Sequence, residues 1–298
     1  MPFTEDDLWP HFVPIWKKLL ELGAGEMFQI AGGYGLFLKQ QWLLANRDEA
    51  IVIPLEQWID PAPRATSDFD LLLGLEFIAD RSTNLKVESI LQENGFEMTE
   101  KPLGQRWQFV KTISDEKTIL AELHAPTPAP THDDLRTEKV RIKPRPSQKG
   151  EGVHGRHNRE AVGAEMFPFR FSLEAVPLAV PNPVTWTVMK LTAMADFWRR
   201  ANDSELSPER RSRARDQAEK HAQDVGRIVA MMTIEERDQA AEILETIRKT
   251  EPFQKAATIF EVAFRSEGWA MLLVHEKWAS EDLETIIDVL RTWFAGNS

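Results

Sequence analysis

Two short stretches decide the fold of this chain: Phe28-Gln29-Ile30-Ala31-Gly32-Gly33-Tyr34-Gly35 and Arg64-Ala65-Thr66-Ser67-Asp68-Phe69-Asp70-Leu71-Leu72-Leu73. The first predicts an apolar strand that ends at a pair of glycines and continues as a helix, because glycine permits a tight backbone turn. The second predicts a strand whose side chains alternate between two faces, so that Asp68 and Asp70 point to the same side. Phe69 and Leu71 then point into the opposite layer.

The side chains of these two stretches indicate a phosphate and metal chemistry. Two carboxylates on one strand face repel each other unless a cation lies between them. Mg²⁺ prefers oxygen ligands and keeps coordination positions open for substrate phosphates. Gly32 and Gly33, at the start of a helix, would offer backbone N–H groups to an anion, and the Ser67 hydroxyl could assist. Taken together, the stretches predict a site for a metal-bound triphosphate, although a simple tight turn and a solvated strand face are the structural alternatives.

The succession of Gly32-Gly33 and Arg64-x-Thr66-x-Asp68-x-Asp70 resembles the nucleotidyltransferase superfamily, and within it the AbiEii/AbiGii toxin-like branch. The resemblance implies an α+β fold, with a mixed β-sheet domain carrying helices and a helical domain after it. It also implies a third carboxylate on a later strand, and Glu122 matches that position. The spacing between Gly33 and Asp68 exceeds that of compact members, so a segment at roughly 47–63 should loop out.

The resemblance also assigns roles to individual residues. Asp68, Asp70 and Glu122 would hold two Mg²⁺ (or Mn²⁺) ions, and Arg64, Thr66 and Ser67 would contribute to nucleotide binding. His124 shares the strand face of Glu122 and is interpreted as a base, a structural hydrogen-bond donor or an ordinary edge histidine.

A second pair of residues comes from the helical part of the chain. Lys190 and Asp224 lie in stretches that resemble paired helix motifs of the same branch. By that resemblance Lys190 would face the nucleotide phosphates, and Asp224 would hold the lysine. An interdomain salt bridge is the structural alternative, since a lysine in an apolar helix needs a partner or an anion.

The function implied by the resemblance is transfer of a nucleoside monophosphate from an NTP to an acceptor hydroxyl. The implied acceptors are RNA, such as a tRNA end, or a protein, and a separately encoded antitoxin would be the partner if the chain belongs to a toxin module. Two alternatives stay open at this point. One is a non-catalytic nucleotide- or RNA-binding protein on the same fold, and the other is a metal-dependent phosphohydrolase that uses the same aspartates.

Composition narrows the class of protein. The 298 residues include 36 Lys or Arg and 47 Asp or Glu, for a formal net charge of -11. This negative charge argues against a protein that binds nucleic acid over its whole surface, because affinity for the phosphate backbone comes from Lys and Arg, and no DNA partner is expected. No apolar run is long enough to span a membrane, and the N-terminus lacks the pattern of a secretory signal. Cysteine is absent, so disulfides and thiolate metal sites are excluded, and a cytoplasmic location is expected.

The predicted organisation has two parts. Residues 1–180 should form the nucleotidyltransferase-like α/β domain, with a flexible basic loop at 126–160, and residues 181–298 should form the helical domain. The basic loop includes eight Lys or Arg between Arg136 and Arg159 against two acids. Residues 166–178 are expected to add one or two strands to the same sheet. Six arginines surround the connection between two of the helices, either as a solvated face or as an RNA contact: Arg199, Arg200, Arg210, Arg211, Arg213 and Arg215.

Overall fold

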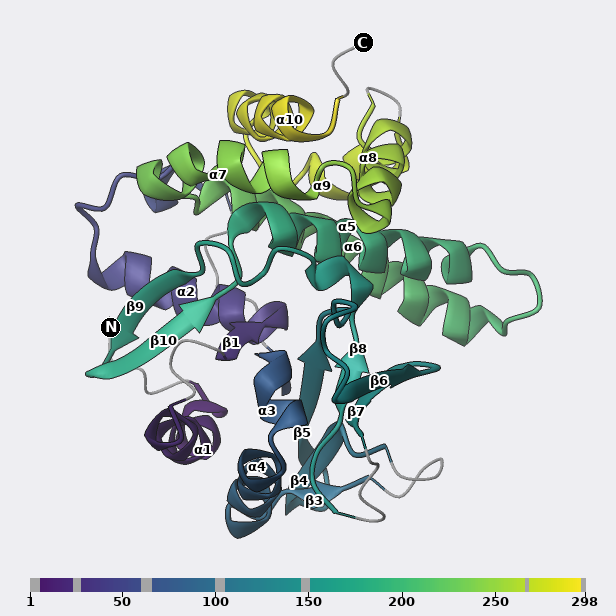
Figure 1. Cartoon of the computed structure of the whole chain (residues 1–298). Helices are drawn as coiled ribbons and strands as arrows, with labels where there is room; N and C mark the ends of the chain where they lie inside the picture. The colour runs from purple at the N-terminus through teal and green to yellow at the C-terminus, as the bar shows by residue number, and fades with distance from the viewer. Residues whose placement is uncertain are drawn as a thin grey trace. The chain divides into compact units, whose positions relative to one another are not determined.

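The computed structural model describes residues 6–23, 28–59, 66–99, 105–145, 151–265 and 268–295. The chain forms two compact units (Figure 1). The sheet unit comprises residues 1–38, 64–159 and 168–181, and the helical unit comprises residues 39–63, 160–167 and 182–298. The predicted combination of a mixed β-sheet with a C-terminal helical region is confirmed.

A mixed sheet of eight strands forms the centre of the sheet unit in the described part of the chain. Its strands are β1 (Phe28–Ala31), β2 (Asp68–Leu73), β3 (Glu97–Met98), β4 (Gln108–Ser114), β5 (Lys117–Ala125), β6 (Leu135–Glu138), β7 (Arg141–Pro144) and β8 (Gly155–His157). The main path runs β1-β2-β5-β8-β7-β6, and β4 pairs with both β3 and β5. Strand β5 is therefore central, with β2 parallel along one edge and β4 and β8 sharing the other.

One face of this sheet is apolar because the strand sequences alternate. In β5, Ile119, Ala121 and Leu123 are fully buried, whereas the residues between them are partly exposed. Phe69 of β2 lies on the buried face, where its ring contacts those of Phe12 and Phe96 at 5.6 Å each. The helices of this unit are α1 (Trp9–Glu21), α3 (Leu75–Ala79), α4 (Arg81–Glu93) and the first residues of α2 (Gly32–Ala45).

The expectation that residues 166–178 extend the main sheet is wrong. Strands β9 (Phe169–Leu173) and β10 (Val176–Val180) pair with each other in a separate two-stranded sheet. Glu174 and Ala175 both have positive φ, of 48° and 61°, as the two central residues of a tight hairpin turn do, and this turn connects β9 directly to β10. The hairpin is fixed to α1 by the Trp16 indole, whose Nε1 donates to the Pro177 carbonyl at 2.7 Å.

The segment at 126–160, expected to be a loop, instead contains three strands, β6, β7 and β8. These strands are only three or four residues long, so their alternation of side chains is too short to stand out in the sequence. A few buried apolar residues attach these strands to the rest of the sheet unit. Leu135 and Ile142 are buried, and Gly155 packs so closely that a Cβ would lie 2.5 Å from the Ala125 Cβ and 2.7 Å from the Ile78 Cδ1.

The helical unit contains, within its described residues, six α-helices besides the end of α2. They are α5 (Pro183–Ala201), α6 (Pro208–Ala230), α7 (Ile234–Ile247), α8 (Glu251–Ala263), α9 (Trp269–Val274) and α10 (Ser280–Phe294). Side chains cap the first three: Asn182 and Ser207 accept from backbone N–H groups, and Thr233 with Glu236 forms a capping box. None of the described helices is long and apolar enough to cross a membrane.

The predicted insertion at 47–63 belongs to this helical unit as far as it is described, including the short helix η2 (Leu55–Gln57). The backbone N–H groups of Val52 and Ile53 donate to carbonyls at the end of α6, at 3.0 and 3.1 Å. The Trp58 ring contacts that of Trp278 edge-on at 4.9 Å. The insertion is therefore a packed part of the helical unit.

A buried ion pair fixes the capping box of α7. Lys39 Nζ lies 2.6 and 2.7 Å from the two carboxylate oxygens of Glu236, and both side chains are almost fully buried. Burial lowers the pKa of Lys39, and the neighbouring Glu236 opposes that effect. The same carboxylate accepts the backbone N–H of Thr233 at 2.8 Å, so the pair joins α2 to the start of α7.

Replacing Glu236 with Ala should destabilise the protein by about 3–5 kcal/mol, because Lys39 would be left buried without its counter-ion. Chemical denaturation measures this change. The exposed pair Lys18–Glu93, at 2.6 Å, provides the control, and Lys18→Ala should change stability by less than about 1 kcal/mol. Equal effects of the two substitutions would contradict the structural role of the buried pair.

A second buried polar cluster fixes the chain just before β8. Arg106 bonds both the Glu88 carboxylate and the Gly152 carbonyl, and Glu88 also accepts the Gly152 N–H at 2.5 Å. Asn84 Nδ2 donates to the Val153 carbonyl at 2.7 Å. His154 is 6% exposed, and its pKa falls to about 4 because burial and then the positive charges around it oppose protonation.

The unfolded chain should therefore bind a proton at His154 between pH 6.5 and about 4 that the folded chain does not bind, and stability is lost as the pH falls through that range. At one pKa unit per 1.36 kcal/mol the loss reaches about 3 kcal/mol. Urea denaturation at pH 7 and pH 4.5 should show a smaller pH dependence for His154→Gln than for the parent chain. Substituting the exposed His275 with Gln serves as control, and an unchanged pH dependence in His154→Gln would refute the assignment.

Candidate metal-binding site

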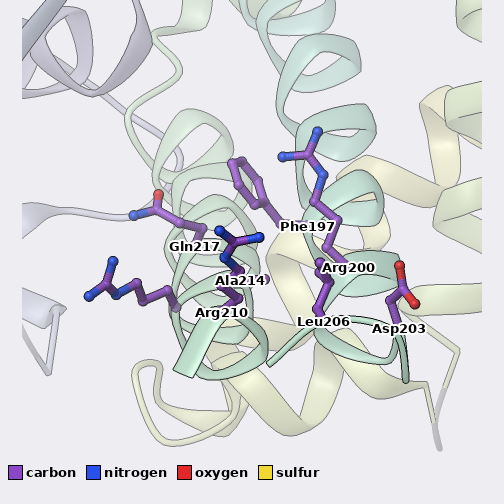
Figure 2. Close-up of a pocket in the computed structure, with 8 residues that line it drawn as sticks. Phe197, Arg200, Asp203, Leu206, Arg210, Ala214 and Gln217 are labelled. Atoms are coloured by element: carbon purple, nitrogen blue, oxygen red, sulfur yellow. The ribbon is translucent and has the colours of Figure 1, made fainter. Parts of the chain in front are cut away.

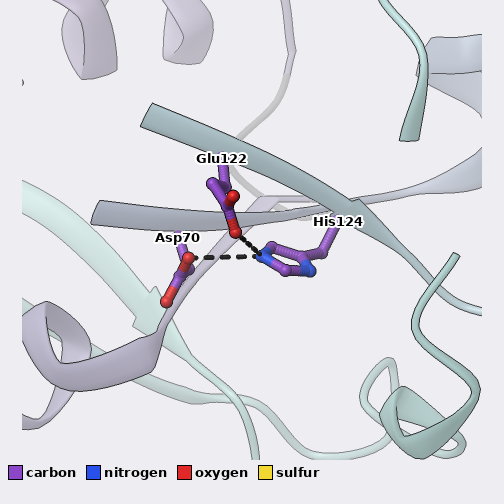
Figure 3. A group of neighbouring side chains, drawn as sticks. All are labelled: Asp70, Glu122 and His124. Carbon is purple, nitrogen blue, oxygen red and sulfur yellow. Dashed lines mark hydrogen bonds and ion pairs between the residues drawn. The ribbon is translucent and has the colours of Figure 1, made fainter. Parts of the chain in front are cut away.

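The pairing of β2 with β5 brings together two of the three predicted carboxylates. Asp70 and Glu122 are cross-strand partners in the parallel register, and His124 follows two residues later on the same face of β5. One donor atom from each of these three side chains lies within 4.8 Å of the other two. Figure 3 shows the imidazole of His124 directed toward both carboxylates.

The glycine turn lies directly against this cluster. Strand β1 runs antiparallel to β2 with Ala31 opposite Asp70, and α2 starts at the next residue, Gly32. Gly32 has a φ of +66°, and a Cβ at this position would collide with Asp70 Oδ2. Any side chain is thus excluded, both by the backbone conformation and by the carboxylate. The helix start and the aspartate therefore form one local structure.

His124 carries the positive charge that keeps the two carboxylates together. Its Nε2 lies 3.2 Å from Asp70 Oδ1 and 3.5 Å from Glu122 Oε2. Burial alone would lower the pKa of His124, but the hydrogen bonds to Asp70 and Glu122 outweigh burial and raise it to about 9. Burial would likewise raise the pKa of Glu122, and the contacts with His124 bring it below its ordinary value. The cluster is an imidazolium between two carboxylates.

Two further residues hold Glu122 in place. Gln108 of β4, its cross-strand partner on the other edge, donates from Nε2 to Oε1 at 2.7 Å. Arg156 of β8 donates from Nη1 to Oε2 at 2.9 Å. Sequence reasoning missed both, and placed Arg156 in a loop. No local signal identifies Gln108, because its contact with Glu122 depends on how β4 pairs with β5.

The remaining predicted residues of the first stretches lie close by or outside the described chain. Asp68 is exposed at the start of β2, two residues before Asp70, and its carboxylate accepts the Thr66 hydroxyl. It is not part of the group within 4.8 Å. Ser67 is exposed at the residue before β2. Arg64 lies outside the described residues, so its predicted role stays a prediction.

Lys190 and Asp224 form a contact within the helical unit. Lys190 Nζ on α5 lies 2.6 Å from Asp224 Oδ2 on α6, and the two residues are 5% and 1% exposed. His221 Nδ1 lies 3.8 Å from the same carboxylate oxygen. Both members of the pair belong to one unit, so the pair itself is not an interdomain bridge. That Lys190 faces nucleotide phosphates stays a prediction.

The donors of the sheet unit fit a divalent cation. Asp70 and Glu122 supply carboxylate oxygens, the ligands that Mg²⁺ and Mn²⁺ prefer. The site already accommodates one cation, the His124 imidazolium, between the two carboxylates. A metal ion bound to Asp70 and Glu122 would replace that charge with a larger one.

A cavity of about 480 Å³ lies elsewhere, at the connection between α5 and α6 (Figure 2). Three of the six predicted surface arginines line it, together with apolar and polar side chains. The lining residues are Phe197, Arg200, Asp203, Leu206, Arg210, Arg213, Ala214 and Gln217. The Arg200 guanidinium lies over the Phe197 ring at 5.4 Å. The cavity contains none of the residues predicted to bind metal or nucleotide.

No protein-family model and no curated protein matches the chain. Among solved structures, the chain is similar to the solution structure of the antibiotic-resistance factor ANT(2'')-Ia, at a TM-score of 0.31 and 13% identity, over 78% of this chain and 94% of that one. Because this similarity is weak, the functional inference depends on the side chains of the site. The AbiEii/AbiGii-like branch stays a prediction.

Replacing Gly32 with Ala should disrupt the site, because the added Cβ would meet the Asp70 carboxylate as well as strain the backbone. Gly23 also has a positive φ, of +81°, but a Cβ added there would meet no atom of the described residues within 4 Å, so Gly23→Ala should cost only about 1–2 kcal/mol of backbone strain. Thermal denaturation should show a larger loss for Gly32→Ala. Partial recovery in the double variant Gly32→Ala/Asp70→Ala would identify the collision, and no recovery would count against it.

Proposed function

We propose that this protein is a Mg²⁺- or Mn²⁺-dependent nucleotidyltransferase that moves a nucleoside monophosphate from an NTP to an acceptor hydroxyl on RNA, such as a tRNA end. The observation that carries the proposal is the contact of the Gly32 turn with Asp70, next to Glu122. Anion-binding backbone and cation-binding carboxylates are thereby combined in a single local structure. A protein hydroxyl is the second acceptor class.

The carboxylates have defined roles in this proposal. Asp70 and Glu122, which are cross-strand partners, would hold a divalent cation together, and Asp68, exposed on the same strand, would take part in holding a second one. Metal ions bound there supply charge neutralisation of the triphosphate and lower the pKa of the attacking hydroxyl. Gln108 and Arg156 fix the Glu122 carboxylate, so that its oxygens keep their orientation beside Asp70.

The remaining residues bind and orient the nucleotide. In the proposal, phosphate oxygens accept from the backbone N–H groups of Gly32 and Gly33 at the start of α2 and from the Ser67 hydroxyl before β2, and Thr66, whose hydroxyl donates to the Asp68 carboxylate, contributes beside them. The acceptor oxygen forms the new bond to the α-phosphorus, the bond from that phosphorus to the bridging oxygen breaks, and pyrophosphate leaves. Glu122 assists removal of the hydroxyl proton.

By the sequence resemblance, Lys190 is proposed as a phosphate ligand that Asp224 holds, and the observed ion pair between the two residues supports the second part of that proposal. Arg64 is a further nucleotide ligand by resemblance. Catalysis of this kind depends mainly on positioning and charge neutralisation, which fits a site made of fixed carboxylates and backbone donors. A toxin role, an antitoxin partner and a cytoplasmic location are part of the same proposal.

The proposed reaction is tested by incubating the full chain with MgCl₂ or MnCl₂, NTPs labelled at the α-phosphate, and total RNA. Label on RNA is the expected result. Label on protein would redirect the proposal to a protein acceptor. Release of free phosphate without transfer would indicate a phosphohydrolase, and bound but unreacted NTP would indicate a binding protein.

Asp70→Asn should abolish transfer and remove most Mn²⁺ binding, because it takes one of two carboxylates from the cluster while leaving the side-chain volume unchanged. Asp68→Asn should also abolish transfer but should keep Mn²⁺ binding at the Asp70–Glu122 site. Transfer assays and Mn²⁺ titration followed by electron paramagnetic resonance separate the two effects.

The exposed Glu97 on β3 offers a matched control for these variants, and Glu97→Gln should leave both measurements unchanged. Circular dichroism establishes that each variant is folded. Full transfer activity in a folded Asp70→Asn protein would eliminate the proposed metal role.

A further inference from the structure

A row of basic side chains continues the face of the sheet that carries Glu122 and His124. The strands next to β5 on this side are β8, β7 and β6 in that order. Each of the three contributes at least one cation, although the whole chain has a net charge of -11. Local charge of this kind decides where a polyanion binds, more than the total charge does.

The register of the strands places these cations on one face. His124 on β5 is opposite Arg156 on β8, and Arg156 is opposite Arg141 on β7. Residues that are opposite each other on neighbouring strands point to the same side of a sheet. The 2.9 Å contact between Arg156 and Glu122 confirms that the row starts at the carboxylates.

The row then extends from β7 to β6. Arg136 is opposite Lys143, and Glu138 is opposite Arg141, so all four side chains share the face of Arg156. The opposite face is closed by apolar packing, with Ile142 fully buried and Gly155 pressed against Ala125.

The cations of the row outnumber the acids near them. Arg136, Arg141 and Lys143 all contact a single carboxylate, that of Glu138. The Lys143 side chain is only 7% exposed, and its ammonium group pairs with the Glu138 carboxylate. The side chains of Arg136 and Arg156 remain 43% and 50% exposed, and Arg141 is 26% exposed. Three arginine side chains of the row are therefore partly exposed to solvent, although each also contacts a carboxylate of the sheet.

We propose that Arg136, Arg141 and Arg156 form a docking row for the phosphate backbone of a single-stranded RNA end whose hydroxyl reaches the Asp70–Glu122 site. The proposal rests on the proposed function for the identity of that site. Across β8, β7 and β6 the row spans about 10 Å at the usual strand spacing, so it meets successive phosphates of a chain. Guanidinium groups bind phosphate oxygens through paired N–H donors. The row therefore favours the negatively charged backbone of RNA over a neutral peptide, which offers no charge to pair with the arginines.

The test uses the full chain, a fluorescently labelled 12-nucleotide RNA and fluorescence anisotropy over a range of KCl concentrations, with EDTA and without NTP. The double variant Arg136→Gln/Arg141→Gln should bind the RNA at least tenfold more weakly. Its slope of log affinity against log salt should be smaller by about 0.7 for each lost phosphate contact, hence by about 1.4 in total. Both substituted side chains lie at the surface, so the melting temperature should change little.

Arg81→Gln is the matched control. Arg81 is an exposed arginine of α4 that also pairs with a glutamate, Glu151 at 3.8 Å, and its replacement removes one positive charge outside the row, as each of the single variants Arg136→Gln and Arg141→Gln does within it. If Arg81→Gln weakened RNA binding as much as a substitution in the row, the loss of affinity would come from net charge alone, and the proposal would be overturned. Failure of the parent chain to bind RNA, or label transfer to protein alone, would overturn it as well.

Inorganic triphosphate and Asp70→Asn separate the docking row from the proposed function. Triphosphate affinity should be the same for the parent chain and the Arg136→Gln/Arg141→Gln variant, and a loss equal to that for RNA would assign the row to the nucleotide instead. Asp70→Asn should bind RNA as the parent chain does while failing in transfer. If transfer to RNA occurs but the double variant binds RNA normally, the docking row is wrong and the proposed function stands.

Discussion

The close approach of Gly32 to Asp70 is the constraint on which the site of this protein depends. Strand β1 ends opposite Asp70, the chain turns through a positive φ, and α2 begins within contact distance of the carboxylate. Because Gly32 has no Cβ, the start of α2 can lie directly against the carboxylate of Asp70 on β2. A helix start is favourable to negative charge, which helps to explain how Asp70 is tolerated there.

The second requirement is that like charges must be held together. Asp70 and Glu122 come from strands far apart in sequence, and their partnership across β2 and β5 would be repulsive without a counter-charge. His124 supplies that charge, and its raised pKa reflects the two carboxylates that hold its proton. The same two carboxylates supply the oxygen donors that a divalent cation would use in place of the imidazolium, and this is the basis of the proposed metal-dependent chemistry.

Buried polar contacts fix individual elements within each of the two units. The Glu88–Arg106–Gly152 cluster fixes the chain that leads into β8, and β8 carries Arg156 to Glu122. In the helical unit, the pairs Lys39–Glu236 and Lys190–Asp224 are buried to a similar degree. Breaking one partner of such a pair is costly because the other charge remains in a low-dielectric environment. These contacts favour a single arrangement of the elements around them.

The sequence by itself determined the elements whose signals are local: the strand–glycine–helix turn at Gly32, the acidic strand at Asp70, the strand of Glu122 and His124, and the helical character of the chain after residue 181. Glycine freedom, strand alternation and helix capping act over a few residues, so they can be predicted without knowing the neighbours. Only the tertiary structure decided that Gln108 and Arg156 bind Glu122, that β9 and β10 leave the main sheet, and that the basic segment forms strands. Those outcomes depend on which strands pair and in which register, and such pairings join residues that are distant in the chain.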